Sequence, residues 1–574
     1  MPQDVLQEIL LRRGFLCPSY EVYGGVSGFY DYAPLGAMLK RNIENLWRRY
    51  FVVEEGFFEV DTPTIAPEQV FVASGHVENF ADPVVSCRKC GTTYRADHLV
   101  QERLGLSSVS AEPEKLQELI NEHGIKCNCG GELGEVARSS LMFSTGIGAG
   151  GRRRGYLRPE TAQGMFILFP RLYAFYRKRL PFGVAQIGRA YRNEISPRQG
   201  LLRLREFTQA EAEIFVDPAE KAKHPRFAKY AGDRLRLLPR DGVEVVLSAS
   251  EAVRRGVLPH EFLAYYLAHT QRFLLELGIP AERLRFRQHL RDEMAHYAED
   301  CWDAEVKTER YGWVEVVGIA DRTDYDLRAH ERMSGAEMKA FRQFSEPVVR
   351  RELRLVPEMQ TLGPEFRALA PKIAEKVRSL GERAAREFER TGRLEVEVGD
   401  ERVVLTERHL RVEEVELRVT GEKFTPHVIE PSFGIDRILY AVLECALSER
   451  EGKRVLRLRP AIAPVKAAVF PLLAKEELEK LARSLFEELR RQGVVAVYDA
   501  SDSIGRRYAR VDEIGVPFAV TVDFESLENG TVTLRLRDTA EQLRVASREV
   551  PELIRSLCSG MSWQELRERL EAES

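Results

Sequence analysis

The amino-acid sequence predicts an α+β protein, in which helices flank a mainly antiparallel sheet and a separate α/β domain forms the C-terminal part. Three patterns lead to this prediction. Residues 191–215 resemble a hairpin, a second strand pair surrounds Trp313, and the chain after residue 456 alternates strand and helix patterns. At 574 residues the chain exceeds the size of one domain, so we expect several.

The first elements come from residues 34–65. Apolar side chains at helical spacing in 34–52 predict a long amphipathic helix that ends near Gly56. Residues 56–65 then predict a strand stopped by Pro63, because proline cannot donate to a β-ladder. The composition becomes polar between 87 and 139, which predicts an insertion.

The opening hairpin, YRNEISPRQGLLRLREFTQAEAEIF, joins two extended runs through SPRQG. Its charged residues are Arg192, Glu194, Arg198, Arg203, Arg205, Glu206, Glu211 and Glu213. If the second arm is unbroken, alternation places Arg203, Arg205, Phe207, Gln209 and Glu211 on one face and Leu202, Leu204 and Thr208 on the other. The first face fits either exposed cross-strand ion pairs or a nucleotide site, where Arg grips phosphate and an aromatic ring faces a base.

The rest of the chain supplies a helix at 258–279, a strand pair at 301–321, and a strand, glycine turn and helix at 427–447. Residues 333–422 are rich in Arg and Glu and predict a second insertion with a helix around 371–389. The expected division is a catalytic core in three parts (1–86, 140–332 and 423–455), two insertions (87–139 and 333–422) and a C-terminal domain (456–574).

Composition excludes several classes of protein. A net charge of -4 excludes a generally basic nucleic-acid coat, although a local basic surface remains compatible with it. The start of the chain lacks the apolar run of a signal peptide, and no stretch approaches the length needed to cross a bilayer. Eight cysteines in so long a chain suit a reducing cytoplasm better than a disulfide scaffold. We therefore expect a cytoplasmic protein without a membrane segment.

Several motifs together resemble a known family. RNEISPRQGLLRLREF is similar to motif 2 of the class II aminoacyl-tRNA synthetases, GFYDYAPLGAMLKRNI with the strand ending at Pro63 is similar to motif 1, and EPSFGIDRILY is similar to motif 3. With YLRPETAQGMF and RRYARVDEIGVPFAVTVD, they resemble the glycyl-tRNA synthetases of the α2 archaeal and eukaryotic type. The resemblance implies a class II catalytic core, an anticodon-binding C-terminal domain, and a homodimer formed through motif 1. It also implies synthesis of glycyl-adenylate from glycine and ATP, and transfer of glycine to tRNA(Gly).

The resemblance assigns the ATP contacts. It implies that Arg192 meets the α-phosphate and the glycine carboxylate, that Phe207 stacks on adenine, and that Arg437 lies on the opposite side of the nucleotide. The catalytic set is Arg192, Glu194 and Arg437. Glu315 is expected to act through Mg²⁺, although a lone acidic residue in a strand is also typical of a cross-strand partner. The expected ATP-binding residues are Arg192, Asn193, Glu194, Leu202, Arg203, Leu204, Arg205, Glu206, Phe207, Glu315, Val316, Gly434, Ile435, Asp436 and Arg437.

Glycine has no side chain, so a selective pocket must exclude one. By the resemblance, Glu160, Glu211 and Glu430 surround the substrate ammonium together with Ser432, and three acidic groups leave no room for the methyl group of alanine. Arg322 is expected at the glycine carboxylate. The expected glycine-binding residues are Arg95, Glu160, Phe207, Thr208, Gln209, Ala210, Glu211, Arg322, Glu430, Pro431, Ser432, Phe433 and Gly434.

Four cysteines are close to a zinc pattern. Cys87 and Cys90 form C-x2-C, whereas Cys127 and Cys129 form C-x-C, one residue shorter than the usual spacing. Both a structural Zn²⁺ site and ordinary or vestigial thiols remain open.

The C-terminal motif carries Arg506, Arg507, Arg510 and Glu513 on an expected short helix. A solvated helix face and contacts with the tRNA anticodon region are both compatible with this pattern. The alternative for the whole chain is an inactive relative that binds nucleic acid as an accessory protein. Such a protein would be expected to lose the phosphate-binding arginines and the substrate carboxylates, which are all present here.

Overall fold

The computed structural model describes residues 3–106, 109–195, 197, 199–291, 294, 298–399 and 401–573, so Arg198 of the hairpin loop lies outside the described residues. The chain divides into two compact units, Lys339–Thr425 and the remainder, which are described separately. In the described part of the chain, no helix is long and apolar enough to cross a membrane.

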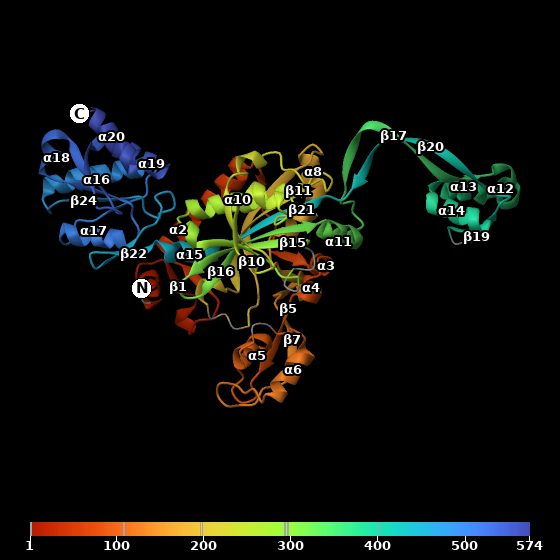
Figure 1. The fold of residues 1–574 in the computed structure, drawn as a ribbon, viewed down its shortest axis with the longest axis horizontal. Helices are drawn as coiled ribbons and strands as arrows, with labels where there is room; N and C mark the ends of the chain where they lie inside the picture. The colour runs from red at the N-terminus through yellow and green to blue at the C-terminus, as the bar shows by residue number, and fades with distance from the viewer. Residues whose placement is uncertain are drawn as a thin grey trace. The chain divides into compact units, whose positions relative to one another are not determined.

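A nine-stranded sheet forms the centre of the larger unit, in the order β13-β12-β14-β15-β16-β21-β11-β10-β3 (Figure 1). Its neighbours are antiparallel except for the pairs β12/β14 and β10/β3. The strands are β3 (Phe58–Glu59), β10 (Phe182–Tyr191), β11 (Glu206–Val216), β12 (Arg234–Leu238), β13 (Val245–Ser248), β14 (Leu284–Gln288), β15 (Asp300–Thr308), β16 (Gly312–Thr323) and β21 (His427–Gly434). The predicted antiparallel sheet is confirmed.

The long helices α2 (Pro34–Arg48), α10 (Glu261–Glu276) and α15 (Ile435–Ala446) contribute to the main core beside this sheet, and shorter helices add to it. The core includes Ala210, Ala212 and Ile214 of β11. Because side chains alternate along a strand, Phe207, Gln209, Glu211 and Glu213 point to the opposite face. The sheet therefore has one apolar face covered by helices and one face that is free to carry polar groups.

The opposite face is bordered by shorter elements. These are β4 (Ile65–Pro67), α3 (Glu68–Ala73), α4 (His76–Asn79), β8 (Ser144–Ile147), β9 (Arg153–Leu157), α7 (Ala162–Ile167), α8 (Phe169–Phe175) and α11 (Tyr325–Ser334). Among them, α7 packs on β11 and α11 packs on α7 and α3. The remaining elements of this region are α1 (Gln3–Arg12), β1 (Leu16–Pro18), β2 (Tyr30–Tyr32), α9 (Ala249–Arg254), β22 (Leu447–Arg450) and β23 (Lys453–Leu456).

The cysteine-bearing insertion is a small subdomain with its own apolar cluster. It consists of β5 (Ala81–Ser86), β6 (Thr93–Arg95), α5 (Ala96–Leu104), α6 (Pro113–Glu122) and β7 (Ala137–Ser140). Its sheet has the order β6-β5-β7 and therefore begins a few residues before the predicted boundary at 87.

The smaller unit is built on a long two-stranded ribbon of β17 (Ala340–Pro357) and β20 (Leu410–Phe424), which leads to a helical part (Figure 1). That part contains α12 (Met359–Phe366), α13 (Ala370–Ser379), α14 (Glu382–Thr391), β18 (Arg393–Val398) and β19 (Glu401–Thr406) around a separate core. The single helix expected at 371–389 is thus two helices, which separate at Leu380 and Gly381. The predicted start at 333 falls within α11.

The C-terminal domain has a five-stranded sheet in the order β25-β24-β26-β27-β28 and its own core. Its elements are β24 (Ala467–Pro471), α16 (Glu476–Arg491), β25 (Ala496–Tyr498), α17 (Ile504–Glu513), β26 (Phe518–Val522), α18 (Phe524–Asn529), β27 (Thr531–Leu536), β28 (Gln542–Ala546), α19 (Val550–Cys558) and α20 (Trp563–Glu573). The pairs of β24 with β25 and with β26 are parallel, as expected, but β26, β27 and β28 pair antiparallel.

Two expectations about local structure are wrong. The strand predicted at 56–65 is split, because β3 joins the large sheet while β4 pairs with β9 in another sheet. The second arm of the hairpin begins only at Glu206, after a loop that contains a 3₁₀ turn at Gly200–Leu202. Arg203 and Arg205 therefore lie in the loop and do not share the strand face of Phe207.

Candidate active site

A pocket opens on the polar face of the large sheet. It is lined by the hairpin, by β16, by β21 and by the start of α15. The lining residues are Arg192, Glu194, Leu201, Leu202, Arg203, Leu204, Phe207, Gln209, Glu315, Val316, Ser432, Gly434, Asp436 and Arg437. Motifs distant in the sequence thus meet in one cavity.

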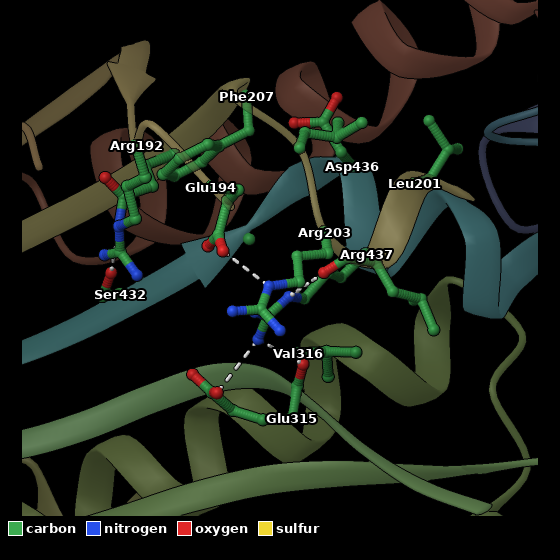
Figure 2. A pocket seen from close by; sticks show the side chains of 14 residues that line it. Arg192, Glu194, Leu201, Arg203, Phe207, Glu315, Val316, Ser432, Asp436 and Arg437 are labelled. Atoms are coloured by element: carbon green, nitrogen blue, oxygen red, sulfur yellow. Dashed lines mark hydrogen bonds and ion pairs between the residues drawn. The ribbon is translucent and has the colours of Figure 1, made fainter. Parts of the chain in front are cut away.

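Two arginines in this pocket are held by carboxylates (Figure 2). Arg203 donates to Glu194 at 2.6 Å. Arg437 donates to the Glu315 carboxylate at 2.9 Å and to the Leu202 carbonyl at 3.0 Å. These ion pairs keep the guanidinium groups extended into a pocket where an anionic ligand can exchange for the carboxylates.

Arg192 lies against aromatic rings. Its guanidinium carbon is 5.2 Å from the Phe207 ring centroid and 5.4 Å from that of Phe80, and its Nε donates to the Pro159 carbonyl at 3.3 Å. Figure 2 shows Arg192 beside Phe207 and pointing toward Ser432. Arg192 therefore lines the pocket and points toward Ser432, the residue that donates to one of the carboxylates described next.

Four residues predicted to bind ATP do not line this pocket. Asn193 donates its backbone N–H to Leu141, and Arg205 donates to the carbonyls of Glu194 and Ser27. Glu206 faces Arg189 at 3.6 Å, and Ile435 is fully buried in the core. Direct side-chain roles for these residues are not supported by their positions.

A cluster of buried carboxylates begins at Glu160, directly after Pro159, whose carbonyl accepts a hydrogen bond from Arg192. Glu211 accepts hydrogen bonds from the Thr161 backbone N–H at 2.8 Å, from the Thr161 hydroxyl, and from Ser432 at 2.6 Å. Glu160 accepts from Gln163 at 2.9 Å, and its other oxygen is 3.6 Å from His76. These bonds fix two of the predicted ammonium-binding carboxylates.

Arg322 has a different environment from the one we expected. Its side chain is 1% exposed and donates to Glu430 at 2.9 Å, to Asp326 at 2.9 Å and to Glu160 at 3.3 Å. The guanidinium therefore neutralises the carboxylate cluster, and the expectation that it binds the glycine carboxylate is corrected.

The carboxylates of this cluster shift one another's pKa values. Burial acts to raise the pKa of Glu160, but Arg322 and His76 outweigh it and hold that pKa well below its ordinary value. Burial, opposed by Arg322 and reinforced by neighbouring carboxylates, raises the pKa of Glu430 to about 8. Burial and the Glu160 charge also raise the pKa of Glu211. One guanidinium is thus too little positive charge for all these groups to ionise at once.

Several residues predicted to bind glycine lie on the other face of the sheet. Ala210 pairs with Phe433 across β11 and β21, and both side chains are buried in the main core. Pro431 pairs with Ile319, another core residue. The Thr208 hydroxyl accepts from Lys40 at 2.6 Å on that same face. Only the backbone of these residues can contribute to a site on the polar face.

Asp436 is also occupied. It accepts from the Thr208 backbone N–H at 2.5 Å, from Lys40 at 3.3 Å and from the Tyr32 hydroxyl. Asp436 therefore joins α2, β11 and α15 beneath the pocket, and its carboxylate is not available to a nucleotide.

Arg95 lies in the cysteine-bearing subdomain, beside two aspartates. It donates to Asp97 at 2.5 Å and is 3.2 Å from Asp82, which is in turn 3.9 Å from Arg203. Arg95 is thereby connected through Asp82 to Arg203 of the hairpin loop, whereas the residues of the carboxylate cluster are held by other partners.

The four cysteines predicted as a metal site come together in space. Cys87 and Cys129 are 3.6 Å apart, as are Cys90 and Cys127, and one ligand atom from each of the four lies within 4.8 Å of the others. These distances are too long for a disulfide, whose sulfurs are about 2.05 Å apart. A side chain at Gly131 would collide with two of the sulfurs, since its Cβ would lie 2.8 Å from Cys87 and 3.2 Å from Cys129.

In the C-terminal domain the predicted tRNA contacts separate into two groups. Arg507 is 2% exposed and donates to backbone carbonyls that include Pro471, while Glu513 pairs with Arg12 and Arg13. These two residues hold internal structure, so their assignment to the tRNA surface is corrected. Arg506 and Arg510 remain near the surface of α17, paired with Asp502.

Sequence reasoning missed the residues that support the carboxylates. His76, Gln163, Asp326 and His330 are buried, and the His330 ring lies 2.8 Å from the Gln163 amide oxygen. Only Gln163 lies in a motif noted from the sequence, YLRPETAQGMF, which also contains Glu160. Glu213 was counted in the charged hairpin but given no function.

Comparison with known proteins identifies the fold and the family. Residues 149–446 match the model of the "tRNA synthetase class II core domain (G, H, P, S and T)", and residues 462–557 match that of the "Anticodon binding domain". A glycine-tRNA ligase from Methanothrix thermoacetophila is 51% identical over 566 residues, which cover 97% of each chain. The chain belongs to the glycine-tRNA ligase family.

Other glycine-tRNA ligases are similar over nearly the whole length. The enzyme of Thermococcus kodakarensis is 50% identical over 96% of this chain and 98% of its own, and that of Archaeoglobus fulgidus is 52% identical over 97% of both. A solved Giardia lamblia prolyl-tRNA synthetase in complex with prolyl-adenylate shares the fold, with a TM-score of 0.53 and 13% identity over 97% of this chain and 79% of that one. The predicted class II fold and glycine-tRNA ligase function are confirmed, and the accessory-protein alternative is not favoured.

Proposed function

We propose that this glycine-tRNA ligase activates glycine in two adjoining subsites on the polar face of its large sheet. The observation that carries this assignment is the position of Arg192, which lines the pocket and points toward Ser432, the donor to Glu211 of the carboxylate cluster. ATP occupies the pocket of Phe207 and Arg437, while the glycine ammonium faces Glu160, Glu211 and Glu430.

Activation then follows from alignment and charge. A glycine carboxylate oxygen attacks the α-phosphorus of ATP, the bond to the β-phosphate oxygen breaks, and pyrophosphate leaves. Arg192 is placed to draw both anions together, since a guanidinium can bind two oxygens at once. The walls of the pocket hold the reactants in line, which lowers the entropic cost of their encounter.

Mg²⁺ is expected to accompany ATP, and a carboxylate is the oxygen ligand that this ion prefers. Glu315 is suited to hold it, because its carboxylate is 48% exposed at the pocket edge and needs only to release Arg437. The ion supplies charge neutralisation on the phosphates. In the second step a hydroxyl at the 3′ end of tRNA(Gly) attacks the acyl carbon and AMP leaves.

Selectivity comes from the small volume around the ammonium. Glu211 is held on both oxygens and Glu160 is held by Gln163, so neither can withdraw to admit a methyl group. Alanine is rejected because it would force apart packed, hydrogen-bonded carboxylates, which costs more than an ordinary methyl contact gains.

Pyrophosphate exchange measured with each of the twenty amino acids tests this proposal. Glycine is expected to support exchange, with alanine and serine near background. Faster exchange with any other amino acid would contradict the assigned pocket.

The four-cysteine cluster is proposed to hold a structural Zn²⁺. A tetrahedral ion with Zn–S bonds of about 2.3 Å places its sulfurs about 3.8 Å apart, close to the observed separations of 3.6 Å. The Lys89 backbone N–H points to the Cys87 sulfur at 3.4 Å, which suits a thiolate ligand.

A homodimer in the cytoplasm is proposed as the working form. Exposed apolar side chains surround the edge strand β3 and the strand β4, including Phe58 (55%), Ile65 (45%), Ile167 (41%) and Phe175 (61%). An edge strand next to apolar side chains is typical of a surface covered by a partner. Light scattering on the wild type and on Phe175→Glu distinguishes a dimer from a monomer.

The surface arginines Arg506 and Arg510 are proposed to contact the anticodon region of tRNA(Gly).

A further inference from the structure

One buried carboxyl in the glycine subsite has no role in the mechanism above. Glu213 follows Glu211 by two residues on β11, so both side chains lie on the polar face of the sheet. Glu213 is 0% exposed, and within the described part of the chain neither of its carboxyl oxygens has a hydrogen-bond partner. A buried polar group without a partner is rare and calls for an explanation.

The surroundings of Glu213 are acidic. Glu211, Glu213 and Glu430 each offer a carboxyl oxygen, and these three atoms lie within 4.8 Å of one another. The charged groups that act on Glu213 come from each neighbouring element, with Glu430 on β21, Arg322 on β16, Glu211 on β11 and Glu160 before α7. Its cross-strand neighbour on β10 is the apolar Val184.

The charges of this cluster do not balance in the empty subsite. Arg322 forms ion pairs with Glu160, Asp326 and Glu430. One guanidinium therefore faces more carboxylates than it can neutralise. Farther out, His76 faces Glu160, and His330 reaches the cluster only through Gln163. Buried anions at such separations repel strongly, so at least one carboxyl must carry a proton.

We propose that Glu213 is a further member of the glycine subsite, protonated while the subsite is empty and deprotonated when the glycine ammonium enters. The inference rests on the proposed position of that ammonium. The charges balance, because one ammonium group enters the subsite and one proton leaves it. The proton passes from the Glu213 carboxyl to solvent.

Glu213 is assigned this proton because neither of its carboxyl oxygens has a hydrogen-bond partner among the described residues, whereas each neighbouring carboxylate accepts at least one hydrogen bond. Glu211 accepts three hydrogen bonds, Glu430 is paired with Arg322, and Glu160 is bonded to Gln163. Burial and the neighbouring Glu430 raise the pKa of Glu213 well above its ordinary value, in agreement with the geometry. The arriving ammonium supplies the missing positive charge and favours the ionised form.

The exchange makes glycine binding dependent on pH. Since binding releases a proton, glycine affinity rises with pH wherever free Glu213 is protonated and the amino group of glycine is still charged. Release of one proton corresponds to about a tenfold change in affinity per pH unit. The empty subsite is thus less negative by one charge, and all of its carboxyls ionise only around a cation.

Two matched ligands test this proposal. Glycyl-sulfamoyl-adenosine is a non-hydrolysable analogue of the adenylate, and acetyl-sulfamoyl-adenosine differs from it only by lacking the ammonium group. Calorimetric titration at pH 6.5 in phosphate and in imidazole counts the protons released, because the two buffers have different ionisation enthalpies. We expect about one proton per site for the glycyl ligand and about none for the acetyl ligand.

The variant Glu213→Gln tests whether the released proton comes from Glu213. Glutamine resembles the protonated carboxyl in shape, so the variant is expected to bind the glycyl ligand with little proton release. The control Glu55→Gln changes another buried glutamate, which is bonded to Tyr265 and Arg226 behind the sheet, and should release protons as the wild type does.

Equal proton release by the two ligands in the wild type would overturn the proposal even if Glu213→Gln failed to fold. Unchanged release in a folded Glu213→Gln would also overturn it. Failure of both ligands to bind the wild type would instead refute the proposed active site itself.

Discussion

Arg322→Met should destabilise the catalytic unit strongly, and more so at high pH. The guanidinium is 1% exposed and donates to three buried carboxylates, Glu160, Asp326 and Glu430. Removing one partner from a buried ionic network costs about 3–5 kcal/mol, because the remaining charges stay buried without compensation. Methionine has a similar length, so the loss of charge dominates over any cavity.

The pH dependence follows from the direction of the pKa shifts. With Arg322 present, the pKa of Glu160 lies below its ordinary value, so this carboxylate adds stability above its unfolded pKa and loses it only as pH falls through the folded one. Without Arg322, burial raises the pKa of these carboxyls, the folded state then binds more protons than the unfolded state, and stability falls as pH rises. The penalty is therefore expected to be largest near pH 8 and smaller near pH 5.5.

Urea unfolding followed by tryptophan fluorescence measures this effect, since Trp47 and Trp302 are fully buried in the core of the catalytic unit. Arg328→Met is the matched control, because Arg328 is 59% exposed on α11 and pairs with Asp324 one turn away on the same helix end. It should change stability by less than about 1 kcal/mol. The reasoning would be refuted if Arg322→Met had the same free energy of unfolding as the wild type at pH 8. It would also be refuted if the variant lost the same amount of stability at pH 8 and at pH 5.5.

Three further changes test other parts of the site. Arg192→Ala should lower glycine-dependent pyrophosphate exchange by at least about 100-fold while circular dichroism and light scattering remain those of the wild type, and near-normal exchange would remove its role. Thr161→Val removes the hydroxyl that donates to Glu211 and should raise the KM for glycine about 10-fold or more with little change for ATP, and equal changes in both values would point to general damage. Cys87→Ser should reduce bound zinc from about one atom per chain, as measured by atomic emission, and the same metal content in both proteins would exclude the four-thiolate site.

The sequence was sufficient for the elements whose periodicity is unambiguous. The helix α10, the strand pair β15 and β16, and the strand and helix of motif 3 all lie where the apolar patterns predict them. Parity in the hairpin also predicted correctly that Phe207, Gln209 and Glu211 share a face. Arg203 and Arg205 were misplaced because alternation holds only inside a strand, and β11 begins after them.

The environment of single charges could not be predicted in the same way. Arg322, Arg507 and Glu513 were expected to meet substrates, yet each is buried in contacts with distant parts of the chain. A residue type and a motif position do not reveal such partners, because the partners are separated in sequence and meet only through the fold. Glu213 was overlooked for the same reason, since its lack of a partner is visible only once the strands are packed.

The boundary between β11 and the preceding loop affects how the proposed amino-acid subsite and the proposed nucleotide site respond to changes in the sequence. A one-residue insertion in β11 would turn Glu211 and Glu213 into the apolar core and bring alanines to the substrate, so the amino-acid subsite is bound to the register of the sheet. The loop at 192–205 carries Arg203 outside the ladder, where its length can change without reversing a strand face. The proposed nucleotide contacts of this loop can therefore be adjusted by loop variation, whereas the proposed choice of amino acid is changed only by substitution in place.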